Sequence, residues 1–126
     1  MRTLRNSRKF RIYKQARKEL TAKFPAAFPR AGKRPALKVG ILEDIRQAGE
    51  LGISMTSCRR FLSIWTSSTA YLVNMGVGKP RVGLDGRHAG WVSEGHSREA
   101  KATLSRRKSA RAQNRHELKT RVAGEL

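Results

Sequence analysis

Acidic residues are scarce in this sequence. Its 126 residues include 9 Asp and Glu against 28 Lys and Arg, for a formal net charge of +19. Such an excess opposes compaction by self-repulsion and favours polyanionic partners. Nucleic acid is therefore the first candidate partner, and an anionic membrane surface is the second.

Cysteine is limited to Cys58, which excludes an intramolecular disulfide and a Cys-rich zinc site. The three histidines, His88, His96 and His116, have no spacing typical of metal ligands. We therefore expect no metal and no cofactor. A single thiol is compatible with a reducing compartment.

Long apolar runs are absent as well. No stretch approaches the ~18 apolar residues of a membrane span, and no apolar run of signal-peptide length follows the basic N-terminus. The basic segments also lack a broad apolar face. These absences predict a cytoplasmic protein with no membrane partner.

The sequence also lacks a catalytic constellation. No Ser/His/Asp order or paired-acid motif is present. The segment Gly76-Val-Gly-Lys has neither P-loop spacing nor a Ser or Thr after its lysine. We expect a protein that is not an enzyme and has no small-molecule substrate.

The charge that is present is unevenly distributed. Residues 1–34 carry 12 basic residues and one acid, residues 35–97 carry 7 and 5, and residues 98–126 carry 9 and 3. A nearly neutral centre is thus flanked by two basic arms. We predict a disordered arm at 1–9, one domain at 10–105 and a helical or disordered extension at 106–126.

Apolar periodicity predicts helices over most of the domain. The first covers about 8–24, the second begins at Pro35 or Ala36 and ends at Ala48, and Ser54 caps a third. Apolar stripes on these three helices are formed by Tyr13, Ala16 and Leu20, by Leu37, Ile41 and Ile45, and by Cys58, Phe61, Leu62 and Trp65. We expect Cys58 to be a small buried hydrophobic residue.

The rest of the domain combines short elements. A short helix is expected through Tyr71 to Gly76, and Asp85-Gly86 predicts a hairpin over 81–92 with a two-residue turn. Ser93 can cap a last helix. The predicted fold is α+β and predominantly helical, with about five helices and one or two small β-hairpins.

Several cations in or next to the centre are candidates for binding phosphate. Arg34 and Lys38 flank the predicted start of the second helix, where free N–H groups favour an anion. Arg59 and Arg60 lie one turn into the third helix, and Lys79 and Arg81 precede the hairpin. Spacing alone favours Tyr71 as a core residue over an aromatic that stacks on a base.

Three blocks of the sequence resemble the ProQ/FinO family of bacterial RNA chaperones. They are Arg34-Pro-Ala-Leu-Lys-Val-Gly-Ile-Leu-Glu-Asp-Ile, Thr66-Ser-Ser-Thr-Ala-Tyr-Leu and Arg81-Val-Gly-Leu-Asp-Gly-Arg-His-Ala-Gly. Their order and spacing are similar to those of the family, as is the preceding Phe24-Pro-Ala-Ala-Phe. The resemblance covers about residues 10–105.

This resemblance implies a compact, mostly helical domain that binds RNA. The implied partners are small RNAs, mRNA 3′ ends and terminator hairpins with a U tail, and the implied role is to stabilise small RNAs and promote sense–antisense pairing in post-transcriptional regulation. We expect a monomer. The resemblance also moves Tyr71 from core to binding site. The predicted RNA-binding residues are Arg34, Lys38, Arg59, Arg60, Tyr71, Lys79, Arg81 and Lys101.

The sequence departs from the family pattern at Met55, where well-known members carry a lysine, and at Gly83, which replaces an acidic residue. Two alternatives remain open. The region Ser54 to Met75 is compatible with a DNA-binding helix-turn-helix, and the charge is compatible with a basic ribosome-associated structural protein.

Overall fold

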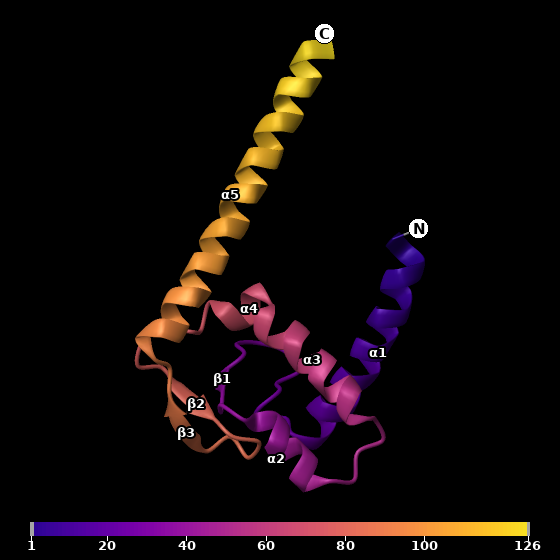
Figure 1. Cartoon of the computed structure of the whole chain (residues 1–126), viewed down its shortest axis with the longest axis vertical. Coiled ribbons are helices and arrows are strands. Elements are labelled where there is room, and N and C mark those ends of the chain that lie inside the picture. Colours follow the sequence, from indigo (N-terminus) through magenta and orange to yellow (C-terminus); the bar gives the residue numbers. More distant parts are fainter. Residues whose placement is uncertain (1, 126) are drawn as a thin grey trace.

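The computed structural model describes residues 2–125, and side chains over residues 8–120. Five helices and one three-stranded sheet form a body from which the ends of α1 and α5 project on the same side (Figure 1). The predicted α+β, mostly helical fold is confirmed. The elements are α1 (Arg2–Lys23), β1 (Ala36–Leu37), α2 (Ile41–Ala48), α3 (Met55–Ser67), α4 (Thr69–Leu72), β2 (Pro80–Val82), β3 (His88–Trp91) and α5 (Glu94–Glu125).

Helix α1 begins earlier than its apolar pattern predicts. Its helical backbone starts at Arg2 rather than near Arg8, so residues 2–9 are helical where disorder was expected. The division of the chain into a domain and two arms stays a prediction. The predicted stripe is confirmed at Ala16 and Leu20, which are fully buried.

The predicted second helix was wrong over its first half. Residues Ala36–Leu37 form strand β1, and α2 begins only at Ile41, after Gly40 in the left-handed region with φ 87°. Leu37 and Ile41 are both buried, so a strand followed by a helix reproduced the i, i+4 spacing of one continuous helix. An anion site at a helix start beside Arg34 is excluded by this register.

Two serines define the ends of α3 and α4. The Ser54 hydroxyl accepts a hydrogen bond from the Ser57 N–H, which confirms the predicted N-cap. Ser68 ends α3 and caps α4, because its hydroxyl accepts from the Tyr71 N–H. The chain therefore turns within a single residue, and Tyr71 is directed into the interior.

The sheet has the order β1-β2-β3, with β1 parallel to β2 and β2 antiparallel to β3. The predicted hairpin is present, but its turn is not the two-residue type. The Gly83 N–H donates to the Arg87 carbonyl, and the Gly86 N–H donates to the Gly83 carbonyl. A two-residue turn would need a positive φ at both Asp85 and Gly86, but of these two only Gly86 has one, at 81°. The backbone therefore forms a three-residue loop that ends in a left-handed glycine.

Aromatic packing joins α1, α3 and the loop between α1 and β1. Phe28 meets Phe61 and Trp65 edge-on, with ring centroids 5.3 and 5.6 Å apart, and Tyr13 stacks on Phe61 at 5.5 Å. Phe28, Phe61 and Trp65 are fully buried. Cys58 is buried beside them, as predicted, and burial raises the pKa of its thiol. This cluster is the centre of the core.

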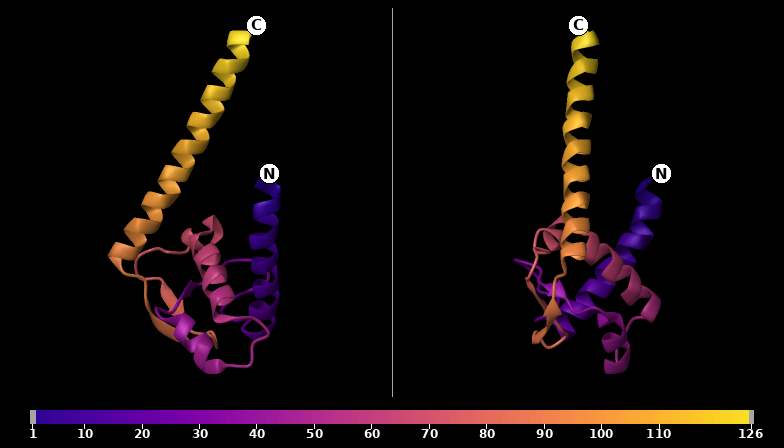
Figure 2. Two further views of the ribbon diagram at one scale, coloured as in Figure 1. Left: turned by 45° about the vertical axis from the view of Figure 1, so that its right-hand side comes forward. Right: turned by 60° about the vertical axis from the view of Figure 1, so that its left-hand side comes forward.

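Helix α5 is partly anchored and partly free. Ser93 accepts a hydrogen bond from the His96 N–H at its start, and Arg107 donates to the Ser67 carbonyl at 2.6 Å. Side chains of residues 108–120 are exposed, and this half projects from the body in each view (Figure 2). No helix within residues 2–125 combines the length and apolar character needed to cross a membrane.

Gly86 allows a test of how the hairpin loop packs. A Cβ at Gly86 would lie 2.8 Å from the Ala26 Cβ, whereas a Cβ at Gly78, with φ 77°, would meet nothing within 4 Å. Gly86→Ala and Gly78→Ala each place an alanine in the left-handed region, which lowers the free energy of unfolding by about 1–2 kcal/mol. Gly86→Ala adds overpacking of about 1–3 kcal/mol, so urea unfolding should find it the less stable. Equal losses would show that the loop does not pack on Ala26.

Candidate nucleic-acid interface

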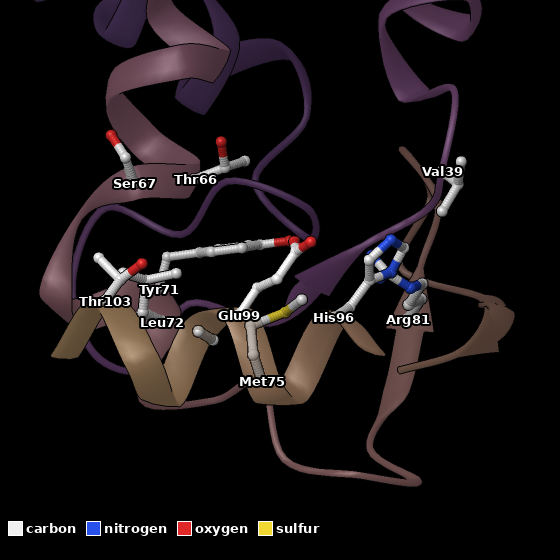
Figure 3. Close-up of a pocket in the computed structure, with 11 residues that line it drawn as sticks. Val39, Thr66, Ser67, Tyr71, Leu72, Met75, Arg81, His96, Glu99 and Thr103 are labelled. Carbon is white, nitrogen blue, oxygen red and sulfur yellow. The ribbon is translucent and has the colours of Figure 1, made fainter. Parts of the chain in front are cut away.

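A cavity of about 330 Å³ lies where the end of β1, the end of α3, α4, β2 and α5 meet (Figure 3). Its wall is mixed, because apolar side chains alternate with hydroxyl, imidazole, guanidinium and carboxylate groups. We name it the α4–α5 pocket. It is lined by Val39, Thr66, Ser67, Tyr71, Leu72, Met75, Arg81, His96, Glu99, Ala100 and Thr103.

Tyr71 belongs to both the core and this pocket. It is 4% exposed, and its hydroxyl accepts a hydrogen bond from the Leu37 N–H at 3.0 Å. The packing role that spacing favoured and the pocket position that the resemblance implied are therefore combined in one side chain. With so little of its surface exposed, Tyr71 does not offer a free ring face for stacking.

Arg81 is a buried cation at the same pocket. It is 6% exposed, and its Nη1 donates to the Leu37 carbonyl at 2.7 Å. Among the residues with described side chains, no carboxylate forms an ion pair with it. A guanidinium has five N–H donors and no acceptor. A buried charge of this kind is expensive without an anion, which makes Arg81 the main electrostatic feature of the pocket.

His96 orients Arg81 from α5. Its Nδ1 lies 2.7 Å from Arg81 Nη2. Because the guanidinium can only donate, this contact needs Nδ1 as an acceptor and therefore a neutral ring with its proton on Nε2. Within the described part of the chain, two of the five N–H donors of Arg81 thus have a hydrogen-bond partner.

Arg34 is fixed at the neighbouring surface by an aromatic contact. Its guanidinium lies 3.7 Å from the centroid of the Trp65 ring and donates to the Ser68 hydroxyl at 2.9 Å. The Asn74 amide also donates to the Arg34 carbonyl at 2.8 Å. These contacts attach the loop before β1 to α3 and α4, so Arg34 is a positioned cation.

Lys38 follows β1 and precedes Val39 of the pocket. Its ammonium is 2.8 Å from the Asp44 carboxylate, and the side chain is 42% exposed. A polyanion can therefore reach it, in competition with Asp44.

The other predicted cations are more dispersed. Arg59, Lys79 and Lys101 are exposed and do not line the α4–α5 pocket. Arg60 lies on a different hollow, between α1 and α3. The structure thus brings Tyr71 and Arg81 into one pocket, places Arg34 and Lys38 on segments beside it, and sets Arg60 apart.

Several pocket residues were missed at the sequence level. His96, Glu99, Ala100 and Thr103 follow one another at helical spacing on α5, so the Ser93 cap was the signal that could have grouped them. Nothing in the sequence indicated that this face would meet Tyr71. No group of three or more His, Cys, Asp or Glu within the described residues is arranged to hold a metal ion.

A small basic α+β domain with a buried arginine in an open pocket has the features of a polyanion-binding module. Residues 11–117 match the ProQ/FINO family, so the chain belongs to the ProQ/FinO family of RNA-binding proteins. It is similar to a ProQ homolog from Legionella pneumophila whose structure was solved by NMR in solution. The two are 27% identical, with a TM-score of 0.62 over 76% of this chain and 83% of that chain. The resemblance inferred from the three sequence blocks is confirmed.

Tyr71→Phe should weaken the fold at β1. The substitution keeps the ring but removes the acceptor of the buried Leu37 N–H, and an unsatisfied buried donor costs about 1–3 kcal/mol. We expect that loss in urea unfolding and faster hydrogen exchange at the Leu37 amide. Tyr13→Phe, which keeps the ring stacked on Phe61, is the control. Unchanged exchange at Leu37 would contradict the assigned hydrogen bond.

Proposed function

We propose that this protein binds structured RNA and holds the RNA 3′ end in the α4–α5 pocket. The expected ligand is an intrinsic-terminator hairpin, a base-paired stem followed by a short U tail. The observation that carries this proposal is Arg81, a buried guanidinium with no carboxylate partner among the described side chains. A phosphate would supply the missing anion through charge-assisted hydrogen bonds.

The rest of the pocket suits the end of a nucleotide chain. Leu72, Met75 and Ala100 offer apolar surface beside Arg81, which can pack against a base or a sugar. Thr66 and Glu99 supply oxygen acceptors for ribose hydroxyl groups. Because the Glu99 carboxylate would repel a terminal phosphate, a free 3′-hydroxyl end is the better ligand.

The stem is assigned to the basic surface around the pocket. In this proposal Lys38 assists Arg81 and Tyr71 at the tail, while Arg34, Arg59 and Lys79 contact stem phosphates. A-form RNA hides its base edges in a deep, narrow major groove, so such contacts recognise shape rather than sequence. Arg60 and Lys101 remain candidates for outlying phosphate contacts.

Binding of this kind gives the protein a role as an RNA chaperone rather than an enzyme. Covering a 3′ end protects it from decay, and basic arms reduce repulsion between two RNAs that pair. We propose that the protein acts as a cytoplasmic monomer on small RNAs and mRNA 3′ ends, without a small-molecule substrate. A helix-turn-helix is disfavoured because α4 is a four-residue helix with Tyr71 buried, and so offers no recognition helix.

Arg81→Gln should weaken binding of a terminator hairpin with a free 3′ U tail by about 10- to 100-fold, as expected for losing charge-assisted hydrogen bonds. A blunt duplex of the same stem should lose much less. Binding is measured by fluorescence anisotropy with labelled RNA. Arg81 also donates a hydrogen bond to β1, so its replacement can weaken the fold as well as binding. A pair of variants at another pocket residue separates the two effects.

Thr103→Glu and Thr103→Gln form that pair. Thr103 lines the pocket and is half-buried on α5, so the two variants differ in charge at nearly equal size. Only the glutamate should lower hairpin affinity, because it repels the tail phosphates. Equal binding by both variants, or equal losses on hairpin and blunt duplex, would rule out the pocket. Preferential co-sedimentation with ribosomal particles would favour the structural alternative.

Salt should weaken the complex strongly. Neutralising about 6–10 phosphates predicts a loss of about 10³- to 10⁵-fold in affinity between 50 and 200 mM salt. A titration series with the hairpin measures this slope. A nearly flat response would contradict an electrostatic complex, whereas a steep response with duplex DNA of the same sequence would show that charge alone does not select RNA.

A further inference from the structure

A second basic surface lies on α1, away from the α4–α5 pocket. Two hollows of about 300 and 340 Å³ flank Tyr13. The first is lined by Lys9, Tyr13, Arg60, Ser63 and Ile64, and the second by Phe10, Tyr13, Lys14, Arg17, Lys18, Thr21 and Arg30. We name their combined lining the α1 surface. It shares no residue with the pocket, and α3 lies between α1 and the pocket elements α4 and α5 (Figure 1).

The charge of the α1 surface is entirely of one sign. Its titratable residues are six cations and Tyr13, and none of its lining residues is acidic. Among the side chains described, no carboxylate pairs with any of these cations. Arg17 is held in place, because its Nη2 donates to the Arg30 carbonyl at 3.3 Å and its guanidinium lies 6.0 Å from the Trp65 ring centroid. The surface thus has the electrostatics of a polyanion site.

Aromatic groups distinguish this surface from a merely solvated basic face. Phe10 is 56% exposed, with the Lys14 ammonium 5.3 Å from its ring centroid. Tyr13 is half-buried and braced by stacking on Phe61. An exposed ring beside a row of cations is the arrangement that binds single strands, in which bases stack on aromatics and cations follow the phosphates. A duplex keeps its bases stacked internally and gains nothing from Phe10.

We propose that the α1 surface is a second binding site, specific for single-stranded RNA, with Phe10 as its stacking platform. If the pocket also binds RNA as proposed above, one molecule holds two RNA segments at once, one at each side of α3. Exposed apolar side chains on the α1 surface are confined to Phe10 and Ile64, which is too small an area to bury in a membrane. The proposal does not depend on what the α4–α5 pocket binds.

The test uses a circular, unstructured, adenosine-rich RNA of about 20 nucleotides, which has no 3′ end to occupy the pocket. Phe10→Leu keeps an apolar side chain but removes the ring. It should weaken binding of the circle by about five- to a hundredfold, the range of base–aromatic stacking. A 2-aminopurine in the circle should be quenched by the wild-type protein and not by this variant.

Matched controls separate stacking and charge from general effects. Trp91→Leu removes another exposed ring, 62% exposed on β3, and should leave circle binding unchanged. Lys14→Gln should weaken it more than Arg8→Gln does, because Arg8 lies on the same helix about 160° around from Phe10. Melting curves verify that each variant is folded.

Three outcomes would overturn the proposal. They are an unaltered circle affinity for Phe10→Leu, equal losses for Lys14→Gln and Arg8→Gln, and binding of anionic lipid vesicles in preference to the circle. The terminator hairpin serves as the independent readout. If Arg81→Gln spares the hairpin while Phe10→Leu still weakens the circle, the pocket hypothesis fails and the α1 surface stands.

Discussion

The peptide groups of Leu37 join strand β1 to the elements that surround the α4–α5 pocket. The N–H donates to Tyr71 of α4, and the carbonyl accepts from Arg81 of β2. Strand β1 has only two residues and pairs with a single neighbour, so these two side chains secure it to the body. The same two side chains also line the α4–α5 pocket. One small hydrogen-bond network therefore secures β1 and shapes the pocket to which we assign RNA binding, and His96 fixes the second arm of Arg81 in it.

Sequence patterns predicted the parts of the fold that are governed by local chemistry. Ser54 and Ser93 marked helix starts because a hydroxyl beside an orphan N–H is a local event. The stripe of Cys58, Phe61 and Trp65 followed from helical period alone. Strand β1 was missed because two residues are too few to show a period of two, and Leu37 and Ile41 fit a helical period by coincidence. The hairpin was located correctly, but its turn type depends on backbone angles that Asp85-Gly86 does not determine.

The pocket was predictable only in part, since its walls come from segments far apart in the chain. Arg81 was a candidate from its place before the hairpin and Tyr71 became one through resemblance to the family, and the structure gives each a packing or hydrogen-bonding role beside its place in the pocket. His96, Glu99 and Thr103 acquire their position from the docking of α5, which Arg107 secures through Ser67. Neither Arg59 nor Arg60 lines this pocket, and Arg60 lies in a hollow against α1 instead.

The scarcity of ion pairs has an effect on the fold itself. The described side chains form three, Lys38–Asp44, Arg46–Glu43 and Arg87–Asp85, against a formal net charge of +19. Added electrolyte shortens the range of the remaining repulsion and so stabilises the compact state against unfolding. A higher ionic strength therefore stabilises the free folded protein but weakens its complex with a polyanion. A bound polyanion takes over the role of the electrolyte, so ligand and folded chain stabilise each other through charge.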